Sequence, residues 1–245
     1  MTGPPRVFER LADPYRSRPP YPDALVARLS ELAGAGRPVV DLGAGTGLLA
    51  VPLARAGHPV FAVEPASAML RVCIEAGAGL PVHPVRAPAE STGLGPLGAG
   101  LVVLADAIQW VKPDASGAEA RRLLAADGVA AVVVPEALDT PFMRGLRALL
   151  TRANPRAASR RPGARVRQWL ALAAGPGPPE VEAWEQRVLL DRERMRAVIR
   201  SLSYGGPALG ARQLERLLGE ADALGEREGR EWALAVRLYF RRVRR

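Results

Sequence analysis

Apolar runs of four to six residues alternate with amphipathic segments between about residue 22 and residue 134. Runs of this length predict strands buried on both faces, and the segments between them place apolar residues at helical spacing. We expect strands at residues 38–42, 60–63, 82–85, 101–105 and 129–134. We expect helices at residues 22–33, 47–55, 67–75 and 115–125. Strands that alternate with helices indicate βαβ units and a mostly parallel α/β sheet.

The pattern changes after residue 134, where a polar stretch rich in arginine and proline separates two helical segments. This change favours a helical insertion over residues 135–200 that covers a substrate, and residues 1–36 are expected to form an N-terminal lid and helix. Further helices are expected at 142–152, 166–174, 192–202 and around 214–221, and strands at 181–190 and 232–240. The strand at 232–240 alternates strictly, as a strand near a sheet edge does. The length of 245 residues fits one domain over 1–245.

The composition is that of a globular protein, with 48% hydrophobic and 24% charged residues. No apolar run approaches the roughly 18 to 20 residues that cross a bilayer. Residues 1–10 carry charge without the apolar core of a signal peptide, so we expect a cytoplasmic protein with no membrane partner. The single cysteine, Cys73, lies between apolar neighbours in an expected helix, which favours a small buried thiol over a nucleophile.

A formal net charge of +9 raises the question of a nucleic-acid partner, because basic surfaces attract phosphates. Lys112 is the only lysine, and the arginines are spread along the chain with clusters at 152–167 and 241–245. Neither cluster is interleaved with the aromatic residues that single-strand binding requires. The sequence therefore favours a solvated basic surface over a nucleic-acid site, and it leaves the oligomeric state open.

The two histidines, His58 and His83, fall in the loop before the second expected strand and within the third. We expect His58 to lie on the side away from the expected site, and we expect a structural role for His83. The chain has no Cys/His spacing typical of a metal site and no Ser-His-Asp order typical of a hydrolase. We therefore predict that it binds no metal.

The most informative segment runs from Asp41 to Gly47, where an apolar strand meets three glycines and then a helix. Glycine at 43, 45 and 47 removes the β-carbons that would keep a ligand away from the backbone, and it permits positive φ in a tight turn. The free N–H groups at the start of the helix suit an anionic group such as a carboxylate. The order of strand, turn and helix predicts a nucleotide-type binding loop.

The next strand ends at a second acidic residue, Glu64, which is followed by Pro65. In a parallel sheet this carboxylate lies beside the carboxyl end of the first strand, where it can accept both hydroxyls of a ribose. The spacing G-x-G-x-G departs from the dinucleotide pattern G-x-G-x-x-G. A nicotinamide or flavin site and a purely structural turn stay open as less favoured alternatives.

At these residues the sequence resembles the class I methyltransferases that depend on S-adenosylmethionine (SAM). It is most similar to a subgroup of small-molecule methyltransferases with an R-P-x-Y-P signature, which reads Arg18-Pro19-Pro20-Tyr21-Pro22 here. The resemblance continues through Ala89-Glu90, Ala107-Ile108-Gln109-Trp110 and Ser201-Leu202-Ser203-Tyr204. It implies a Rossmann-like, doubly wound, mostly parallel seven-stranded sheet with an antiparallel C-terminal strand.

The resemblance also implies roles for individual residues. Gly43, Ala44 and Gly45 would line the methionine part of SAM, Glu64 would hold the ribose and Met69 would pack against adenine. Asp41 would orient the loop or the ligand amino group, and Arg18 would meet the SAM carboxylate. The further implied contacts with SAM are Tyr15, Tyr21, Pro65, Ala89, Glu90, Ala105, Gln109 and Trp110. From the sequence, Glu90 is equally suited to bracing its loop.

The chain departs from the family pattern at three places. Pro88 stands where an aspartate commonly precedes Ala-Glu, and Gln109 stands where the family usually carries histidine. Glutamine can position a substrate but cannot take a proton at neutral pH, so Asp106 is a candidate base. Pro135-Glu136 replaces a Trp-Asn pair expected after the fifth strand. The candidate catalytic residues are Asp106, Gln109 and the aromatic Tyr204.

Three functions follow in order of preference. The first is methyl transfer from SAM to an oxygen or nitrogen of a small molecule in specialised metabolism. The second, motivated by Gln109 and by the Pro135 region, is cyclisation of SAM itself to azetidine-2-carboxylate with release of methylthioadenosine. The third is a methyltransferase that binds nucleic acid through the arginine clusters.

Overall fold

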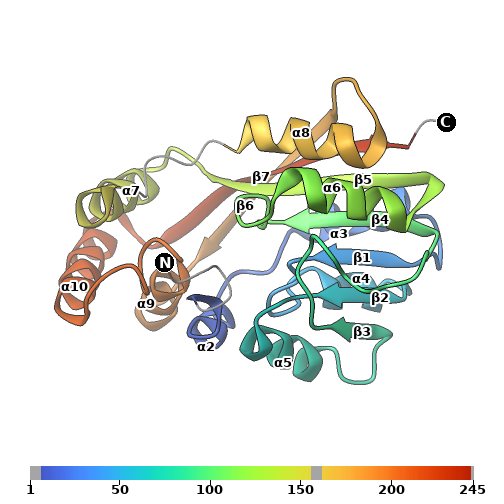
Figure 1. Ribbon diagram of the computed structural model, residues 1–245. Coiled ribbons are helices and arrows are strands. Elements are labelled where there is room, and N and C mark those ends of the chain that lie inside the picture. Colours follow the sequence, from blue (N-terminus) through green and yellow to red (C-terminus); the bar gives the residue numbers. More distant parts are fainter. Residues whose placement is uncertain (1–6, 156–161, 244–245) are drawn as a thin grey trace. The chain divides into compact units, whose positions relative to one another are not determined.

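The computed structural model describes residues 7–155 and 162–243. Seven strands form one sheet in the order β3-β2-β1-β4-β5-β7-β6 (Figure 1). The strands are β1 (Val39–Leu42), β2 (Val60–Val63), β3 (Val82–Val85), β4 (Ala99–Ala105), β5 (Leu124–Ala137), β6 (Glu180–Leu189) and β7 (Glu231–Arg242). Strands β1 to β5 are joined by parallel pairings, and the C-terminal strand is antiparallel. The predicted Rossmann-like sheet is therefore confirmed.

Apart from a short helix at residues 12–15, which the pattern does not predict, the helices follow the predicted order. They are α2 (Ala12–Tyr15), α3 (Asp23–Ala33), α4 (Ala50–Arg55), α5 (Ser67–Ala76), α6 (Pro113–Leu123), α7 (Pro141–Ala153), α8 (Gly163–Ala174), α9 (Arg192–Ser201) and α10 (Ala211–Glu228). The predicted start of α4 at Gly47 is wrong, because residues 47–49 form turns before the helix begins at Ala50.

Strand β5 is longer than the sequence predicted, and this corrects two expectations. The helix expected at 115–125 ends at Leu123, because Leu124 is extended and pairs with Ala99 of β4. A register irregularity follows, and pairing resumes between Leu101 and Val129. At the other end, Pro135 and Glu136 lie inside β5 and not after it.

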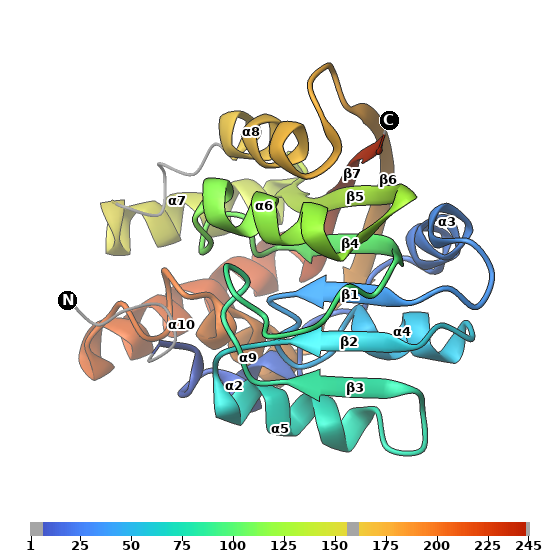
Figure 2. The same ribbon diagram turned by 45° about the vertical axis from the view of Figure 1, so that its right-hand side comes forward.

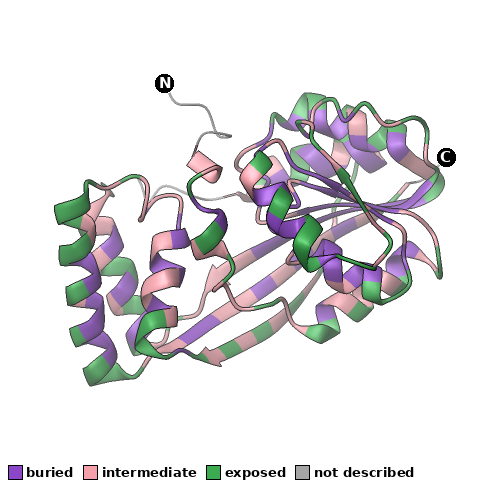
Figure 3. Cartoon of the chain, turned by 90° about the horizontal axis from the view of Figure 1, so that it is seen from below, coloured by how far each residue is buried: buried purple, intermediate pink, exposed green. Residues whose placement is uncertain are grey.

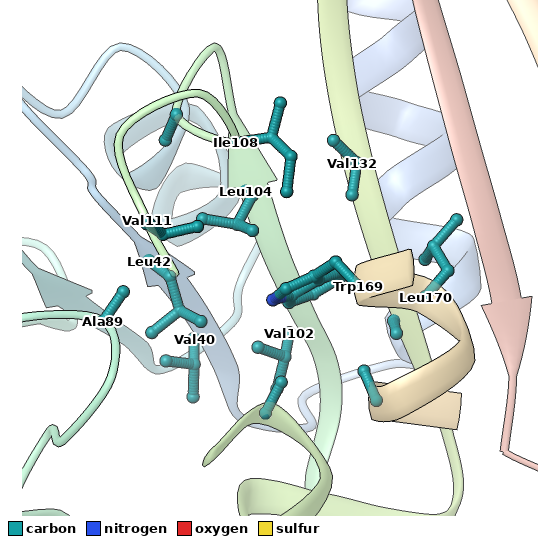
Figure 4. Packing of buried hydrophobic residues seen from close by; sticks show 14 of the residues in the cluster. Val40, Leu42, Ala89, Val102, Leu104, Ile108, Val111, Val132, Trp169 and Leu170 are labelled. Atoms are coloured by element: carbon teal, nitrogen blue, oxygen red, sulfur yellow. The ribbon is translucent and has the colours of Figure 1, made fainter. Parts of the chain in front are cut away.

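The chain divides into two compact units. The described residues of unit 2 are 20–135, 162–184 and 236–243, and they include β1 to β4 with α3, α4, α5, α6 and α8. Figure 2 shows the parallel strands of this unit side by side, with α5 at the β3 end and α6 next to α8. Its core contains Val40, Leu42, Val102 and Leu104 from the strands, and the fully buried Trp169 from α8 (Figure 4).

The described residues of unit 1 are 7–19, 136–155 and 185–235. Helices α7, α9 and α10 pack around a separate core that includes Phe142, Leu146, Ile199 and Leu218. These helices are amphipathic, and Figure 3 shows buried and exposed positions alternating along the helices. The segment predicted as an insertion, 135–200, is shared between the units, with α7 and α9 in unit 1 and α8 in unit 2.

Candidate functional site

The glycine turn (residues 43–47) follows β1 and is tied to the end of β2. The backbone N–H groups of Gly43 and Ala44 both donate to the carbonyl oxygen of Val63, at 2.8 and 3.0 Å. The Gly47 N–H then donates to Ala44 at 2.9 Å and closes the turn. Two neighbouring strand ends therefore fix the turn at the carboxyl edge of the sheet, which is the edge where α/β sheets bind ligands.

All three glycines of this turn have positive φ, at +75°, +56° and +84° for Gly43, Gly45 and Gly47. A β-carbon at Gly43 would lie 2.9 Å from the Ala107 β-carbon, and one at Gly47 would lie 2.8 Å from the Cys73 Sγ. A β-carbon at Gly45 would meet nothing within 4 Å. Close packing thus explains Gly43 and Gly47, whereas Gly45 leaves open space beside the backbone.

Glu64 is buried at the end of β2, and its carboxylate is held by two backbone amides. Gly45 N–H donates to Oε2 at 3.0 Å, and Ala66 N–H donates to Oε1 at 2.8 Å. Amide donors fix the orientation of a carboxylate and leave lone pairs on each oxygen for further donors. Glu64 can therefore accept two hydroxyl groups of a ligand that lies along the open position at Gly45.

Asp41, in β1, is 1% exposed, and its Oδ1 has no hydrogen-bond partner within the described segments. Burial, and after it the nearby charge of Glu64, raises the pKa of the Asp41 carboxyl to about 7. A hydrogen bond from the Ala50 amide acts in the opposite direction. A cation bound beside Asp41 and Glu64 would be attracted by both carboxylates and would favour the ionised form of Asp41.

Helix α5 closes the turn from the other side. Met69 is buried there, and Cys73 packs against Gly47. Burial, with the charges of Asp41 and Glu64 as lesser causes, raises the pKa of the Cys73 thiol to about 12. A thiol that stays protonated is a poor nucleophile. The predicted burial of Cys73 is confirmed, and its purely structural role stays a prediction.

The β4 loop (residues 106–111) carries the predicted catalytic residues Asp106 and Gln109. Asp106 has a φ of +51°, the only positive φ at a non-glycine position in the described parts of the chain. The Gln109 Nε2 donates to the Asp106 carbonyl at 2.8 Å and to its Oδ1 at 3.3 Å. Ala107 of the same loop contacts the glycine turn at Gly43, so the two segments lie together. Strained backbone of this kind clusters at functional sites.

The remaining predicted SAM contacts of unit 2 lie around these segments. Ala105 ends β4 and is half-buried, as are Trp110, Pro65 and Tyr21. Ala89 is buried in the core next to the sheet. The carboxylate of Glu90 accepts a hydrogen bond from the Lys112 amide at 2.7 Å, so Glu90 braces the start of α6. Its contact with a ligand stays a prediction.

Three further predicted site residues, Tyr15, Arg18 and Tyr204, belong to unit 1. The Arg18 guanidinium lies 3.8 Å from the centre of the Tyr15 ring, a cation–π contact. Its Nε donates to the Ser201 Oγ at 2.9 Å and its Nη2 donates to the Ser201 carbonyl at 3.1 Å. Tyr204 offers its carbonyl oxygen to the Asn154 Nδ2 at 2.9 Å. Arg18 thus joins the N-terminal signature to the Ser201–Tyr204 segment.

The two histidines differ in their surroundings, since His58 is buried and His83 is exposed. The His58 ring is buried between the Ser30 hydroxyl, at 2.7 Å, and the Arg37 carbonyl, at 3.0 Å. His83 of β3 stacks on Phe61 of the neighbouring strand β2, with ring centroids 4.9 Å apart. Across residues 7–155 and 162–243, no group of three His, Cys, Asp or Glu residues is arranged to hold a metal ion.

Two residues of this site have contacts that the sequence did not predict. Ala107 supports the glycine turn, and Arg165 of α8 donates to the carbonyl oxygens of Ile108, at 3.2 Å, and of Val111 in the β4 loop. A small apolar residue and one arginine among many carry no pattern that distinguishes them. Their roles depend on contacts between segments far apart in the sequence.

Comparison with known proteins gives this site its context. Residues 40–132 match a family model described as a methyltransferase domain. An uncharacterised methyltransferase of Mycobacterium tuberculosis (strain H37Rv) is 38% identical over 114 residues, or 46% of this chain and 45% of that protein. The match therefore spans less than half the length of this curated relative.

Two solved structures extend the comparison to most of the chain. A protein from Anaeromyxobacter dehalogenans, provisionally named a type II methyltransferase, is 26% identical with a TM-score of 0.66, covering 93% of this chain and 97% of that one. A protein from Anabaena variabilis, provisionally named a methyltransferase from an antibiotic biosynthesis pathway, shares the fold with a TM-score of 0.67. It is 20% identical and covers 89% of this chain and 96% of that one.

The sheet order, the glycine turn and its acidic partner resemble those of the class I SAM-dependent methyltransferases. The match of residues 40–132 to a methyltransferase domain implies SAM as the co-substrate. The residues present fit SAM, because open space at Gly45 adjoins a fixed carboxylate and the unpartnered Oδ1 of Asp41 adds negative charge for a sulfonium. No helix in the part of the chain that the structure describes could span a membrane.

Proposed function

We propose that this chain transfers the methyl group of SAM to an oxygen or nitrogen atom of a small molecule, in the formation of a specialised metabolite. The observation that carries the proposal is the open position at Gly45 beside the Glu64 carboxylate, which is already held by two amides. The likeness in fold to a protein named for an antibiotic biosynthesis pathway supports a small-molecule acceptor. The N-terminal R-P-x-Y-P signature supports membership of the small-molecule subgroup.

In this proposal the glycine turn binds the methionine part of SAM, Glu64 binds the ribose hydroxyls and Met69 packs against adenine. The two amides that hold Glu64 preorganise its oxygens, so little ordering is needed on binding. The other proposed SAM contacts are Tyr15, Arg18, Tyr21, Asp41, Pro65, Ala89, Glu90, Ala105, Gln109 and Trp110. The segment 135–200 and the N-terminal residues 1–36 are proposed to cover the acceptor.

When bound, SAM supplies a methyl carbon on a positively charged sulfur, so the leaving group needs no proton. The work left to the protein is to align the acceptor and to exclude water. Gln109 holds the β4 loop through its amide and cannot act as a base at neutral pH. Asp106 is the proposed base, and Tyr204 is the proposed aromatic partner of the acceptor. Acceptors that are already ionised or have a free amine would react with the least help from a base.

One observation favours a second candidate, the cyclisation of SAM itself. Gln109 replaces the usual histidine, and its amide is committed to the Asp106 backbone. In this candidate reaction the α-amino nitrogen of SAM attacks the γ-carbon of the same arm and loses a proton. The Cγ–S bond breaks, so the products are azetidine-2-carboxylate and methylthioadenosine.

Incubation of the pure protein with SAM alone, and then with panels of phenols, carboxylates and amines, tests both candidates. The proposal expects SAM to persist without acceptor and S-adenosylhomocysteine to form with at least one acceptor class. A Glu64→Gln variant should lose this turnover, and a Glu228→Ala variant, changed at an exposed residue of α10, should keep it. Methylthioadenosine that forms at enzymatic rates without acceptor would replace methyl transfer with the cyclase.

A further inference from the structure

Arg165 connects helix α8 to the β4 loop within unit 2. It is the third residue of α8 and is half-buried. Its Nε donates to the Ile108 carbonyl at 3.2 Å, and its Nη2 donates to the Val111 carbonyl. One planar guanidinium therefore bridges two backbone carbonyls on either side of Gln109 and Trp110. Hydrogen bonds from a charged donor are stronger than those between neutral groups.

The position of Arg165 is not explained by the stability of its own helix. A cation in the first turn of a helix is disfavoured by the positive end of the helix dipole. Helix α8 also has no side-chain cap, since Pro162 stands at its N-cap position. The carbonyl dipoles of Ile108 and Val111 compensate the charge, so Arg165 is matched to the β4 loop and not to α8.

Helix α8 is a rigid platform for this contact. A β-carbon at Gly117 of α6 would lie 2.7 Å from the Leu172 β-carbon, so the two helices touch closely there. The Gln168 Nε2 donates to the Asp114 Oδ1 at 2.9 Å and adds a polar contact between them. Trp169 is fully buried in the same core cluster as Ile108 and Val111 (Figure 4). A side chain on such a platform can hold its target within tight limits.

The β4 loop needs such support because its conformation is strained. Asp106 is in the left-handed region, and the loop is a turn in which the Trp110 N–H donates to Ala107 at 2.9 Å. The Gln109 side chain donates a hydrogen bond to the Asp106 carbonyl, and Arg165 donates to two carbonyls further along the loop, those of Ile108 and Val111. Strain of this kind persists only where the surroundings over-determine it.

We propose that Arg165 is a positioning residue, which fixes the β4 loop and with it Gln109 and Trp110 against the glycine turn. This inference rests on the proposed methyl transfer, in which those two residues face SAM and the acceptor. Arg165 lies outside residues 40–132, the part of the chain that the family model matches. The role therefore comes from the contacts of this chain alone.

Amide hydrogen exchange of the β4 loop and calorimetric titration with SAM test the proposal in Arg165→Gln, Arg165→Lys and Arg167→Gln. Arg167 is an exposed arginine of the same helix and serves as the matched control. In Arg165→Gln, exchange of the Trp110 and Lys112 amides should become at least tenfold faster, and SAM should bind about tenfold more weakly. The exchange rates and the SAM affinity of Arg165→Lys should lie between those of the wild type and Arg165→Gln, since one ammonium replaces the guanidinium that reaches two carbonyls. Arg167→Gln should match the wild type.

Faster exchange confined to residues 106–112 supports a positioning role. Loss of protection throughout α6, α8 and β4, or no change in either readout, would overturn it. If Arg165→Gln does not fold, Arg165→Lys decides the question by the same two readouts. Absence of SAM binding by the wild type would contradict the proposed function, whereas exchange in the ligand-free protein would still test the contact of Arg165 with the loop.

Discussion

Asp41 illustrates how the burial of a carboxyl group makes the stability of the fold depend on pH. Its carboxyl has a pKa raised from 3.8 to about 7 by burial and by Glu64, so the folded protein binds a proton there more readily than the unfolded chain. Stability from this group is complete below the ordinary value of 3.8 and is lost as the pH rises to about 7. A bound cation would recover part of that loss.

The variant Asp41→Asn tests this linkage. It cannot ionise, so its melting temperature relative to the wild type should rise between pH 4.5 and pH 8, with the window set by the raised pKa of Asp41. Thermal unfolding at several pH values measures the difference. A difference that is constant over this range, or that falls as the pH rises, would contradict the assignment of a raised pKa to Asp41.

Gly45 and Gly47 form a matched pair at the same turn. Both have positive φ, which disfavours alanine by about 1–2 kcal/mol. Gly47→Ala adds a clash at 2.8 Å with Cys73, so it should cost at least about 1 kcal/mol more than Gly45→Ala in unfolding free energy. Gly45→Ala should fold but bind SAM at least tenfold more weakly. Calorimetry and thermal unfolding measure the two effects, and wild-type SAM affinity in Gly45→Ala would show that the open space is not the binding site.

At the scale of elements, the hydrophobic pattern predicted every strand of the sheet and the order of its helices. This succeeded because strands buried on both faces carry unbroken apolar runs, as at Val39–Leu42 and Val60–Val63. The pattern failed at the start of β5, where pairing with Ala99 makes Leu124 extended although the preceding residues are helical. Strand pairing is a tertiary effect that local spacing does not contain.

The same difference between local pattern and tertiary contacts applies to the candidate site. The motifs Asp41–Gly47 and Glu64-Pro65 could be read from the sequence, because each depends on residue types at the end of one strand. The contacts of Ala107 with Gly43 and of Arg165 with the β4 loop could not, because they join separate segments. The ligand contacts predicted for Tyr15 and Arg18 stay predictions, since the structure describes these residues within unit 1.

Two glycines within helices, Gly219 and Gly117, should respond in opposite ways to substitution by alanine, because only Gly117 is closely packed. Alanine is favoured over glycine within helices by about 1 kcal/mol. Gly219 of α10 is exposed with nothing near its would-be β-carbon, so Gly219→Ala should stabilise the protein by about 0.5–1 kcal/mol. Gly117→Ala should instead destabilise it by about 1–3 kcal/mol, because the added carbon would lie 2.7 Å from Leu172. Denaturant unfolding compares them, and a stabilised Gly117→Ala would contradict the close contact of α6 with α8.

At the scale of the whole molecule, the net charge of +9 attracts nucleic acid only as far as the arginines are not already paired with carboxylates. Many arginines are paired with carboxylates, among them Arg28 with Glu182, Arg37 with Asp127 and Arg196 with Asp222. Binding of a single-stranded oligonucleotide should therefore be weak and should disappear between about 50 and 200 mM salt, as counterion release predicts. Fluorescence anisotropy measures it, and tight binding that survives 200 mM salt would favour a nucleic-acid substrate.

Calorimetric titration of the wild type, Glu64→Ala and Glu228→Ala tests whether SAM binds at the glycine turn beside Glu64. The wild type and Glu228→Ala should bind one SAM per chain with the same affinity. Glu64→Ala should bind at least tenfold more weakly, because the ribose loses the carboxylate that Gly45 and Ala66 hold in place. Equal affinity in Glu64→Ala, or no binding by the wild type, would contradict SAM binding at this turn.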